Sequence, residues 1–138
     1  MRGMLSNRSM PPSTVIPVIP YPNLSDAIVW LTAAFGFGLR VRIADHRAQM
    51  DVPPDGHVVL GAVDDGSAIS PARVMVRVSD AHSHAARAVA AGAKMISPPQ
   101  DYPYGERQYT VEDFAGHRWT FSESIGDVDP ADWGGTAG

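Results

Sequence analysis

An α+β fold of two tandem βαβββ modules is predicted by three features of this sequence. The chain repeats itself, because the segment 15–36 has an echo at 72–92 and Gly56-His57 recurs as Gly116-His117 about 60 residues later. Turn signals such as Pro53-Pro54-Asp55-Gly56 separate short apolar runs. Each half contains one helical pattern, and a unit of this size cannot bury its apolar face alone. We therefore expect the two modules to form curved mixed sheets around a cleft.

The first module is expected over residues 13–66. Val15 to Ile19 reads as a strand, and Pro17 and Pro20 place that strand at a sheet edge. Asn23 is suited to cap the helix that follows, with Asp26 in its first turn and Gly36 at its end. Three further strands are then expected at 39–43, 48–52 and 57–63.

The second module is expected over residues 72–123, in the same order. Val74 to Val78 reads as a strand, and Asp80 caps an alanine-rich helix that ends at Gly92. A proline- and tyrosine-rich loop is expected at 97–105. Three further strands are expected at 93–96, 107–111 and 117–122.

The rest of the chain is assigned to the two ends and the core. Residues 1–12 are expected to be a disordered tail, and 124–138 a C-terminal extension anchored by Trp133; 13–123 then form a single domain. Apolar residues at helical or strand spacing form the predicted core, which comprises Ile28, Leu31, Phe35, Val59, Val76, Ala85, Val89, Val111 and Phe121.

The composition excludes several classes of function. A net charge of -4 with scattered basic residues argues against a nucleic-acid partner, because phosphate binding needs clustered Lys and Arg. The longest apolar stretch near the start is far short of the ~20 residues needed to span a membrane. The chain has no cysteine, which excludes disulfides and thiolate chemistry and fits a cytoplasmic location.

Two motifs make the chain resemble the vicinal-oxygen-chelate superfamily, which includes glyoxalase I, extradiol dioxygenases and bleomycin-resistance proteins. The segment from Asn23 to Trp30, followed by Phe35-Gly36-Phe37, resembles the first-helix signature of that superfamily. Tyr104 to Arg107 and Asp113 to Trp119 resemble the last-hairpin motif of its antibiotic-resistance-like branch. The resemblance covers about 15–123 and implies the glyoxalase/bleomycin-resistance fold, commonly as a homodimer. Phe114 stands where that motif has proline, which we expect to alter the turn only.

The resemblance also implies where a metal would be held. Carried over, the family's ligand positions fall near Pro17, Leu60, Val74 and Thr120, and none of these side chains is a strong ligand for a divalent metal. We therefore expect no metal and no cofactor, which disfavours the metal-dependent glyoxalase and dioxygenase chemistries.

The histidines are mostly expected to be structural. His82 and His84 are two apart on a helix, so they cannot pair on one face and are expected to be solvated. His57 and His117 flank turns and are expected to stabilise them. His46 precedes a strand that should line the cavity, which makes it a candidate ligand contact.

Further candidate ligand-binding residues follow from strand alternation. If Thr120 faces the cavity, Arg118 and Ser122 share that face by strand alternation, whereas Trp119 and Phe121 face the helices. Arg107 and Tyr109 share one face of the preceding strand, and the sequence leaves open which face that is. Tyr102 and Tyr104 lie in a loop where aromatic rings could clasp a flat ligand, or pack on their own sheet.

Two functions remain from the sequence. The first is a binding protein that takes an apolar or aromatic small molecule into a metal-free cleft, for drug sequestration or resistance. The alternative is a metal-independent isomerase or lyase with His46 or a tyrosine as general base; a metal-dependent lyase or dioxygenase ranks third. The sequence leaves open whether the protein is an enzyme, because this fold hosts many chemistries.

Overall fold

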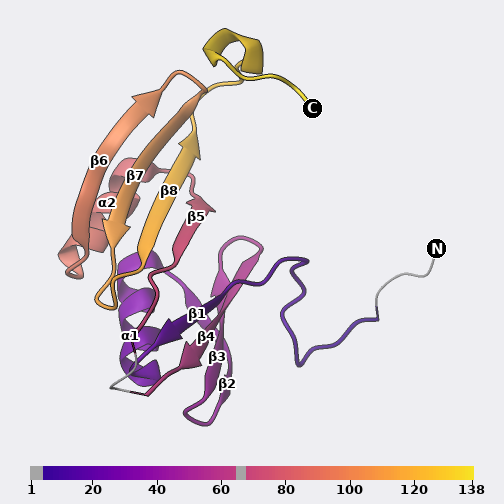
Figure 1. Ribbon diagram of the computed structural model, residues 1–138, viewed down its shortest axis with the longest axis vertical. Helices are drawn as coiled ribbons and strands as arrows, with labels where there is room; N and C mark the ends of the chain where they lie inside the picture. Colours follow the sequence, from indigo (N-terminus) through magenta and orange to yellow (C-terminus); the bar gives the residue numbers. More distant parts are fainter. Residues whose placement is uncertain (1–4, 65–67) are drawn as a thin grey trace. The chain divides into compact units, whose positions relative to one another are not determined.

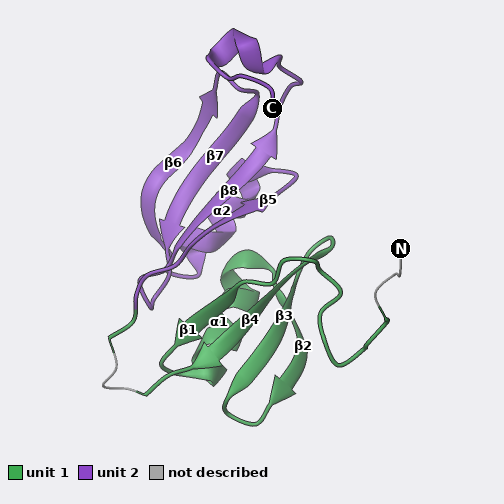
Figure 2. Ribbon diagram, turned by 45° about the vertical axis from the view of Figure 1, so that its right-hand side comes forward, with its two compact units in different colours: residues 1–69 green, residues 70–138 purple. Residues whose placement is uncertain are grey.

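The computed structural model describes residues 5–64 and 68–138, which form two compact units, 1–69 and 70–138 (Figure 2). Unit 1 contains β1 (Val18–Tyr21), α1 (Leu24–Phe35), β2 (Gly38–Ile43), β3 (Arg47–Val52) and β4 (Gly56–Ala62). Unit 2 contains β5 (Arg73–Arg77), α2 (Ala81–Ala90), β6 (Lys94–Tyr102), β7 (Glu106–Glu112), β8 (Arg118–Ser124) and the short 3-10 helix η1 (Pro130–Trp133).

The two units have the same mixed-sheet topology (Figure 1). The strand order is β1-β4-β3-β2 in unit 1 and β5-β8-β7-β6 in unit 2. The first strand of each unit runs parallel to the last, and the other pairings are antiparallel. The predicted α+β fold of two βαβββ modules is therefore confirmed.

One helix packs on one face of each sheet, and it starts where the sequence predicts. The side chain of Asn23 accepts a hydrogen bond from the backbone N–H of Asp26 at 2.9 Å. Asp80 does the same for Ser83 at 3.1 Å. α1 ends at Gly36, whose φ of 75° lies in the left-handed region that glycine adopts without strain. Both caps were predicted from local sequence alone.

The prolines displace two strand boundaries from their predicted positions. The first strand starts at Val18 rather than Val15, and it contains Pro20. β6 runs from Lys94 to Tyr102, so it includes most of the segment predicted as a loop. Its pairing with β7 shifts between Met95 and Ser97 and again between Ser97 and Gln100. β1 and β6 are both edge strands, where a residue without an N–H is tolerated.

The core of each unit lies between its sheet and its helix. Of the predicted core, Leu31, Phe35, Ala85, Val111 and Phe121 are buried, and Ile28, Val59 and Val76 are half-buried. The prediction for Val89 was wrong, because this side chain is 48% exposed. The buried stripe of α2 consists of Ala81, Ala85 and Ala88, and Val89 follows that stripe by one position, which turns it towards solvent.

Residues 8–13 lie on the open face of the unit 1 sheet, opposite α1. Gln49 donates to the backbone oxygen of Ser9 at 2.8 Å and accepts from Arg40. Arg40 also donates to the backbone oxygen of Arg8, and Pro11 is buried. Gln49 is only 3% exposed, so this segment covers the middle of the face.

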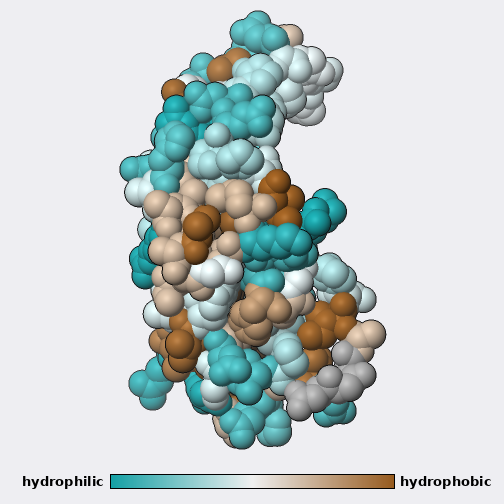
Figure 3. Space-filling view, turned by 90° about the vertical axis from the view of Figure 1, so that its left-hand side faces the viewer, coloured by the Kyte–Doolittle hydropathy of each residue, from teal (hydrophilic) through white to brown (hydrophobic). Residues whose placement is uncertain are grey.

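Several large hydrophobic side chains are exposed at the surface. On the face drawn in Figure 3, they form separate patches among polar residues. Scattered exposed apolar side chains are normal for a protein surface. Among the described residues, no helix is long and apolar enough to cross a membrane.

Candidate functional site

Strand alternation divides β8 into a helix-facing side and an open side. Trp119 and Phe121 are fully buried on the helix-facing side, as predicted. The residues between them lie on the open side, and Thr120 and Ser122 belong to this set. A pocket lies on this open face of unit 2.

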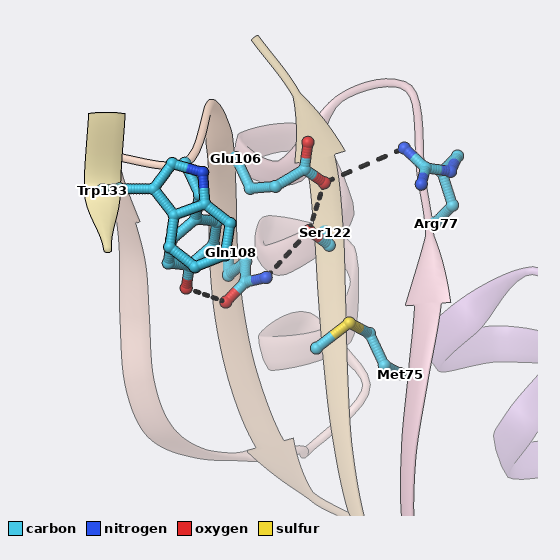
Figure 4. A pocket seen from close by; sticks show the side chains of 7 residues that line it. Met75, Arg77, Glu106, Gln108, Ser122 and Trp133 are labelled. Carbon is cyan, nitrogen blue, oxygen red and sulfur yellow. Dashed lines mark hydrogen bonds and ion pairs between the residues drawn. The ribbon is translucent and has the colours of Figure 1, made fainter. Parts of the chain in front are cut away.

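The pocket has a volume of about 660 Å³ (Figure 4). Its lining comes from β5, β7, β8, the turn after β6, and η1 of the C-terminal segment. The lining residues are Met75, Arg77, Tyr104, Glu106, Gln108, Ser122 and Trp133.

Aromatic rings form one side of the pocket. The rings of Tyr102 and Tyr104 stack, with centroids 5.3 Å apart and planes 12° apart. The indole of Trp133 lies 5.3 Å from the Tyr104 ring at an angle of 60°. Trp133 remains 43% exposed, so part of its surface is available to a ligand.

A glycine brings the C-terminal segment to this aromatic side. Gly105 has a φ of 82°, and any Cβ placed on it would collide with the backbone oxygen of Gly126. Its own backbone oxygen accepts a hydrogen bond from Ile125 at 2.8 Å. Only glycine therefore fits this close approach, which leads the chain on to Trp133.

A continuous line of hydrogen bonds forms the polar side. The hydroxyl of Tyr104 donates to Gln108 Oε1 at 3.1 Å, and Gln108 Nε2 donates to Ser122 Oγ at 3.0 Å. Ser122 Oγ in turn donates to Glu106 Oε1 at 2.7 Å. Figure 4 shows these bonds running across the pocket from below Trp133 towards Arg77.

Glu106 is the negative charge of the pocket. Hydrogen bonds from Ser124 and then Ser122, together with the nearby positive charge of Arg77, hold the pKa of Glu106 below its usual value. The nearest guanidinium nitrogen of Arg77 lies 3.8 Å from Glu106 Oε1. By contrast, burial raises the pKa of the Tyr104 phenol. At neutral pH the pocket therefore contains a carboxylate and an uncharged phenol.

The structure places three of the predicted site residues on or near this face in different ways. Tyr104 lines the pocket, and Tyr102 supports its ring from outside the lining. Thr120 shares the open face but forms a hydrogen bond with Thr110 at 2.8 Å.

Arg118, also on the open face, lies at the opposite end of β8 from Ser124. Its Nε atom is 4.0 Å from Glu112 Oε1. Neither Arg118 nor Thr120 is among the residues that line the pocket.

Arg107 and Tyr109 lie on the helix-facing side of β7, which answers the question that the sequence left open. Tyr109 is 1% exposed and forms a hydrogen bond with His84 of α2. Arg107 forms two bonds to Asp101, at 2.6 and 3.2 Å, and lies 3.7 Å from Glu123. The structure therefore places both side chains away from the pocket.

His46 lies in the exposed turn between β2 and β3 of unit 1. Its backbone oxygen accepts a hydrogen bond from Ala62 at 2.8 Å, which ties the turn to β4. The imidazole is not part of the pocket lining in unit 2. Its predicted ligand contact stays a prediction.

The pocket contains residues that were not predicted as site residues. Met75, Arg77 and Trp133 come from an edge strand and from the C-terminal extension. Glu106, Gln108 and Thr110 alternate along β7 with Tyr109 and Val111, and this period-2 pattern is the signal in the sequence that could have marked an open face. Ser122 was placed on the open face by alternation but was not predicted to bind a ligand.

The predicted metal-ligand positions need a correction of one residue. Ile19 pairs with Leu60 in unit 1, whereas Met75 pairs with Thr120 in unit 2. Leu60 is fully buried on the helix-facing side, so it is not equivalent to Thr120, which lies on the open face. The residue of unit 1 that is equivalent to Thr120 is Val59, which pairs with Val18. Val74 pairs with the buried Trp119 and likewise faces the core. The likeness of Gly56-His57 to Gly116-His117 had suggested the wrong register.

The corrected open-face positions do not fit a divalent metal either. They are occupied by Val18, Val59, Met75 and Thr120, and a thioether and a hydroxyl are weak ligands for zinc, iron or manganese. Within residues 5–64 and 68–138, no three acidic or histidine side chains form a possible metal site.

Two of the histidines make structural contacts with segments distant from or next to their own strands. His117 Nδ1 accepts a hydrogen bond from the backbone N–H of Ala72 at 2.8 Å, which ties β8 to the start of β5. His57 lies 2.6 Å from Ser13 Oγ and 3.2 Å from Asp51. The prediction for His84 was wrong: it is half-buried, with its ring 4.1 Å from that of Phe121.

Comparisons with known proteins agree with this architecture. Residues 14–121 match the model of the Glyoxalase/Bleomycin resistance protein/Dioxygenase superfamily. The crystal structure of TioX from Micromonospora sp. ML1 is 33% identical and covers 82% of this chain and 99% of its own, with a TM-score of 0.71. A comparison with curated proteins finds no match.

Two more distant structures share the fold. A glyoxalase/bleomycin resistance protein/dioxygenase from Nocardioides is 19% identical, with a TM-score of 0.68 over 98% of this chain and 93% of its own. Lactoylglutathione lyase from Agrobacterium tumefaciens is 14% identical, with a TM-score of 0.66 over 84% of this chain and 97% of its own. The match of the family model over most of the chain decides the assignment: this protein belongs to the glyoxalase/bleomycin resistance protein/dioxygenase superfamily.

Proposed function

We propose that this protein binds an apolar or aromatic small molecule in the pocket on the open face of unit 2, without a resident metal, and that binding serves drug sequestration or resistance. The observation that carries the proposal is the pairing of Tyr104 with a partly exposed Trp133. These rings lie beside the hydrogen-bonded side chains of Gln108, Ser122 and Glu106, which form the polar floor of the pocket. A volume of about 660 Å³ is within the usual range for small-molecule sites.

The lining suits a flat aromatic ligand. Indole and phenol rings offer large apolar surfaces that stack at low cost in conformational entropy. Met75, on β5, is 64% exposed, and its flexible thioether side chain can adjust to rings of different shape. The polar groups along the other side would orient the ligand.

The alternative, a metal-independent isomerase or lyase, has less support from the ionisable groups that line this pocket. A general base needs a pKa near the working pH. The lowered pKa of Glu106 makes it a weak base, and the raised pKa of Tyr104 keeps the phenol protonated. Binding without turnover is therefore favoured over acid–base catalysis.

A homodimer is also part of the proposal. β1 and β5 are edge strands, and each has an exposed apolar residue, Val18 and Met75. Unpaired edges with apolar side chains are surfaces that a second copy can cover. Light scattering at micromolar concentration tests this, and a monomer mass would contradict it. The cytoplasmic location expected from the composition stays a prediction.

The experiment is a thermal-shift screen with planar aromatic drugs, followed by measurement of affinity. Trp133→Ala should weaken binding of a hit by roughly threefold to tenfold, which corresponds to one aromatic contact. The matched control is Phe114→Ala, which removes another exposed aromatic ring, from the β7–β8 turn. Equal losses in both variants would place the ligand elsewhere, and a new product mass would indicate an enzyme.

A further inference from the structure

The hydrogen bonds on the pocket floor can run in only one direction. Glu106 is ionised at neutral pH, because its pKa is held below the usual value, and an ionised carboxylate can only accept. Ser122, 2.7 Å away, must therefore donate its hydroxyl proton to Glu106. The Ser122 oxygen is then left with lone pairs for its other neighbour.

This direction fixes the orientation of the Gln108 amide. The amide group of Gln108 has to turn its NH₂ towards Ser122 Oγ, at 3.0 Å, because that oxygen can only accept there. Its oxygen then faces Tyr104, whose hydroxyl donates across 3.1 Å. Ser122 is 4% exposed, so water has little access to compete for the middle of this line.

A definite pattern of free groups is left for a ligand. Gln108 keeps a second N–H that can donate, and its oxygen keeps a second lone pair. The Tyr104 hydroxyl donates its proton to Gln108, so its oxygen can only accept a hydrogen bond from a ligand. A ligand beside the Tyr104 ring therefore meets the N–H donor of Gln108 next to the acceptor oxygens of Gln108 and Tyr104.

The charges around the floor oppose an anionic ligand. The side chain of Glu106 is 19% exposed and accepts from Ser122 within the pocket. Arg77, its partner at 3.8 Å, is 73% exposed, so water screens it. In Figure 4, Arg77 lies on the far side of Glu106 from Trp133. A ligand carboxylate close to Tyr104 and Trp133 would therefore meet the negative charge of Glu106 before the positive charge of Arg77.

We propose that the pocket selects neutral aromatic ligands that carry a carboxamide or lactam edge, in which an N–H lies next to a carbonyl. The N–H would donate to the Tyr104 oxygen, and the carbonyl would accept from Gln108. This proposal rests on the proposed function, because it assumes that the ring lies against Tyr104 and Trp133. It adds the chemical class that the polar floor recognises.

The test uses isothermal titration calorimetry with four probes that share one ring system: 2-naphthamide, methyl 2-naphthoate, 2-methylnaphthalene and 2-naphthoate. We expect 2-naphthamide to bind roughly threefold to tenfold more tightly than the ester or the hydrocarbon, which is the usual effect of one net hydrogen bond. We expect the anionic 2-naphthoate to bind most weakly.

Two variants test the cause of this preference. Ser122→Ala breaks the line, so the amide of Gln108 can flip, and the advantage of 2-naphthamide should fall to within about twofold of the ester. Gln108→Glu removes the N–H donors and should abolish that advantage even if Ser122→Ala does not fold. The control is Thr110→Val, which removes the bond to Thr120 on the same face and should leave the order of probes unchanged.

The outcomes separate the two proposals. Similar affinity for the three neutral probes, or tightest binding of 2-naphthoate, overturns the selection for an amide edge and leaves the aromatic pocket in place. An advantage of 2-naphthamide that persists in both variants also overturns it. If none of the four probes binds either the unaltered protein or the Trp133→Ala variant, the proposed function itself is contradicted.

Discussion

The carboxylate of Asp113 accepts a hydrogen bond from the indole N–H of Trp119 at 3.0 Å, beneath the turn that joins β7 to β8. Its other oxygen accepts from the backbone N–H groups of Ala115 and His117, both at 3.0 Å. Asp113 is 5% exposed and Trp119 is fully buried. One carboxylate therefore holds both the turn and the largest side chain of the unit 2 core.

Asp113→Ala should destabilise the protein by about 2–4 kcal/mol, because it leaves buried donors without a partner. Urea denaturation measures the change. Asp132→Ala, at an exposed position of η1, is the matched control and should change the free energy of unfolding by less than about 0.5 kcal/mol. Equal effects of the two substitutions would show that the buried hydrogen bonds contribute little.

Leu31→Ala should cost about 2–5 kcal/mol, since Leu31 is fully buried between α1 and its sheet and truncation leaves a cavity. Val29→Ala on the same helix is the control, because Val29 is 69% exposed. Thermal unfolding of both variants gives the comparison. A small loss for Leu31→Ala would contradict this arrangement of the unit 1 core.

Glu106 should make stability fall at acid pH. Its folded-state pKa lies below the ordinary value of 4.5, so the ionised carboxylate contributes stability that is fully present above 4.5 and is lost as pH falls through the folded pKa. Glu106→Gln should remove this part of the dependence. Urea denaturation between about pH 3 and about pH 7 tests it, and parallel curves for the two proteins would contradict it.

The features that were predicted correctly from the sequence, the helix caps and the alternation along β8, depend only on the spacing of residues close together in the chain. Asn23 and Asp80 cap the helices because a cap needs only its own side chain and the next three residues. The alternation of Trp119 and Phe121 with the open-face residues of β8 was also predicted correctly. These features need no knowledge of which strand lies beside which.

The polar floor depends on strand register, and for this reason it was missed. Glu106, Gln108 and Ser122 meet only because β7 pairs with β8 so that Gln108 lies opposite Ser122. A shift of one residue turns every side chain to the other face, as the error at Leu60 illustrates. Trp133 reaches the pocket through the turn at Gly105, a contact between segments distant in sequence.

Tyr109→Phe tests the remaining difference between the sequence prediction and the structure. The sequence placed Tyr109 among the ligand-binding residues, whereas the structure buries its hydroxyl against His84. Removal of this hydroxyl should cost about 0.5–2 kcal/mol of stability, because the imidazole loses a partner in a half-buried site. The affinity of a pocket ligand should change by less than about twofold, since the hydroxyl lies on the opposite side of the sheet. Calorimetry with a hit from the drug screen, beside urea denaturation of the same sample, separates the two effects. A large loss of affinity with unchanged stability would support the sequence prediction and would mean that the ligand lies on the helix-facing side of β7.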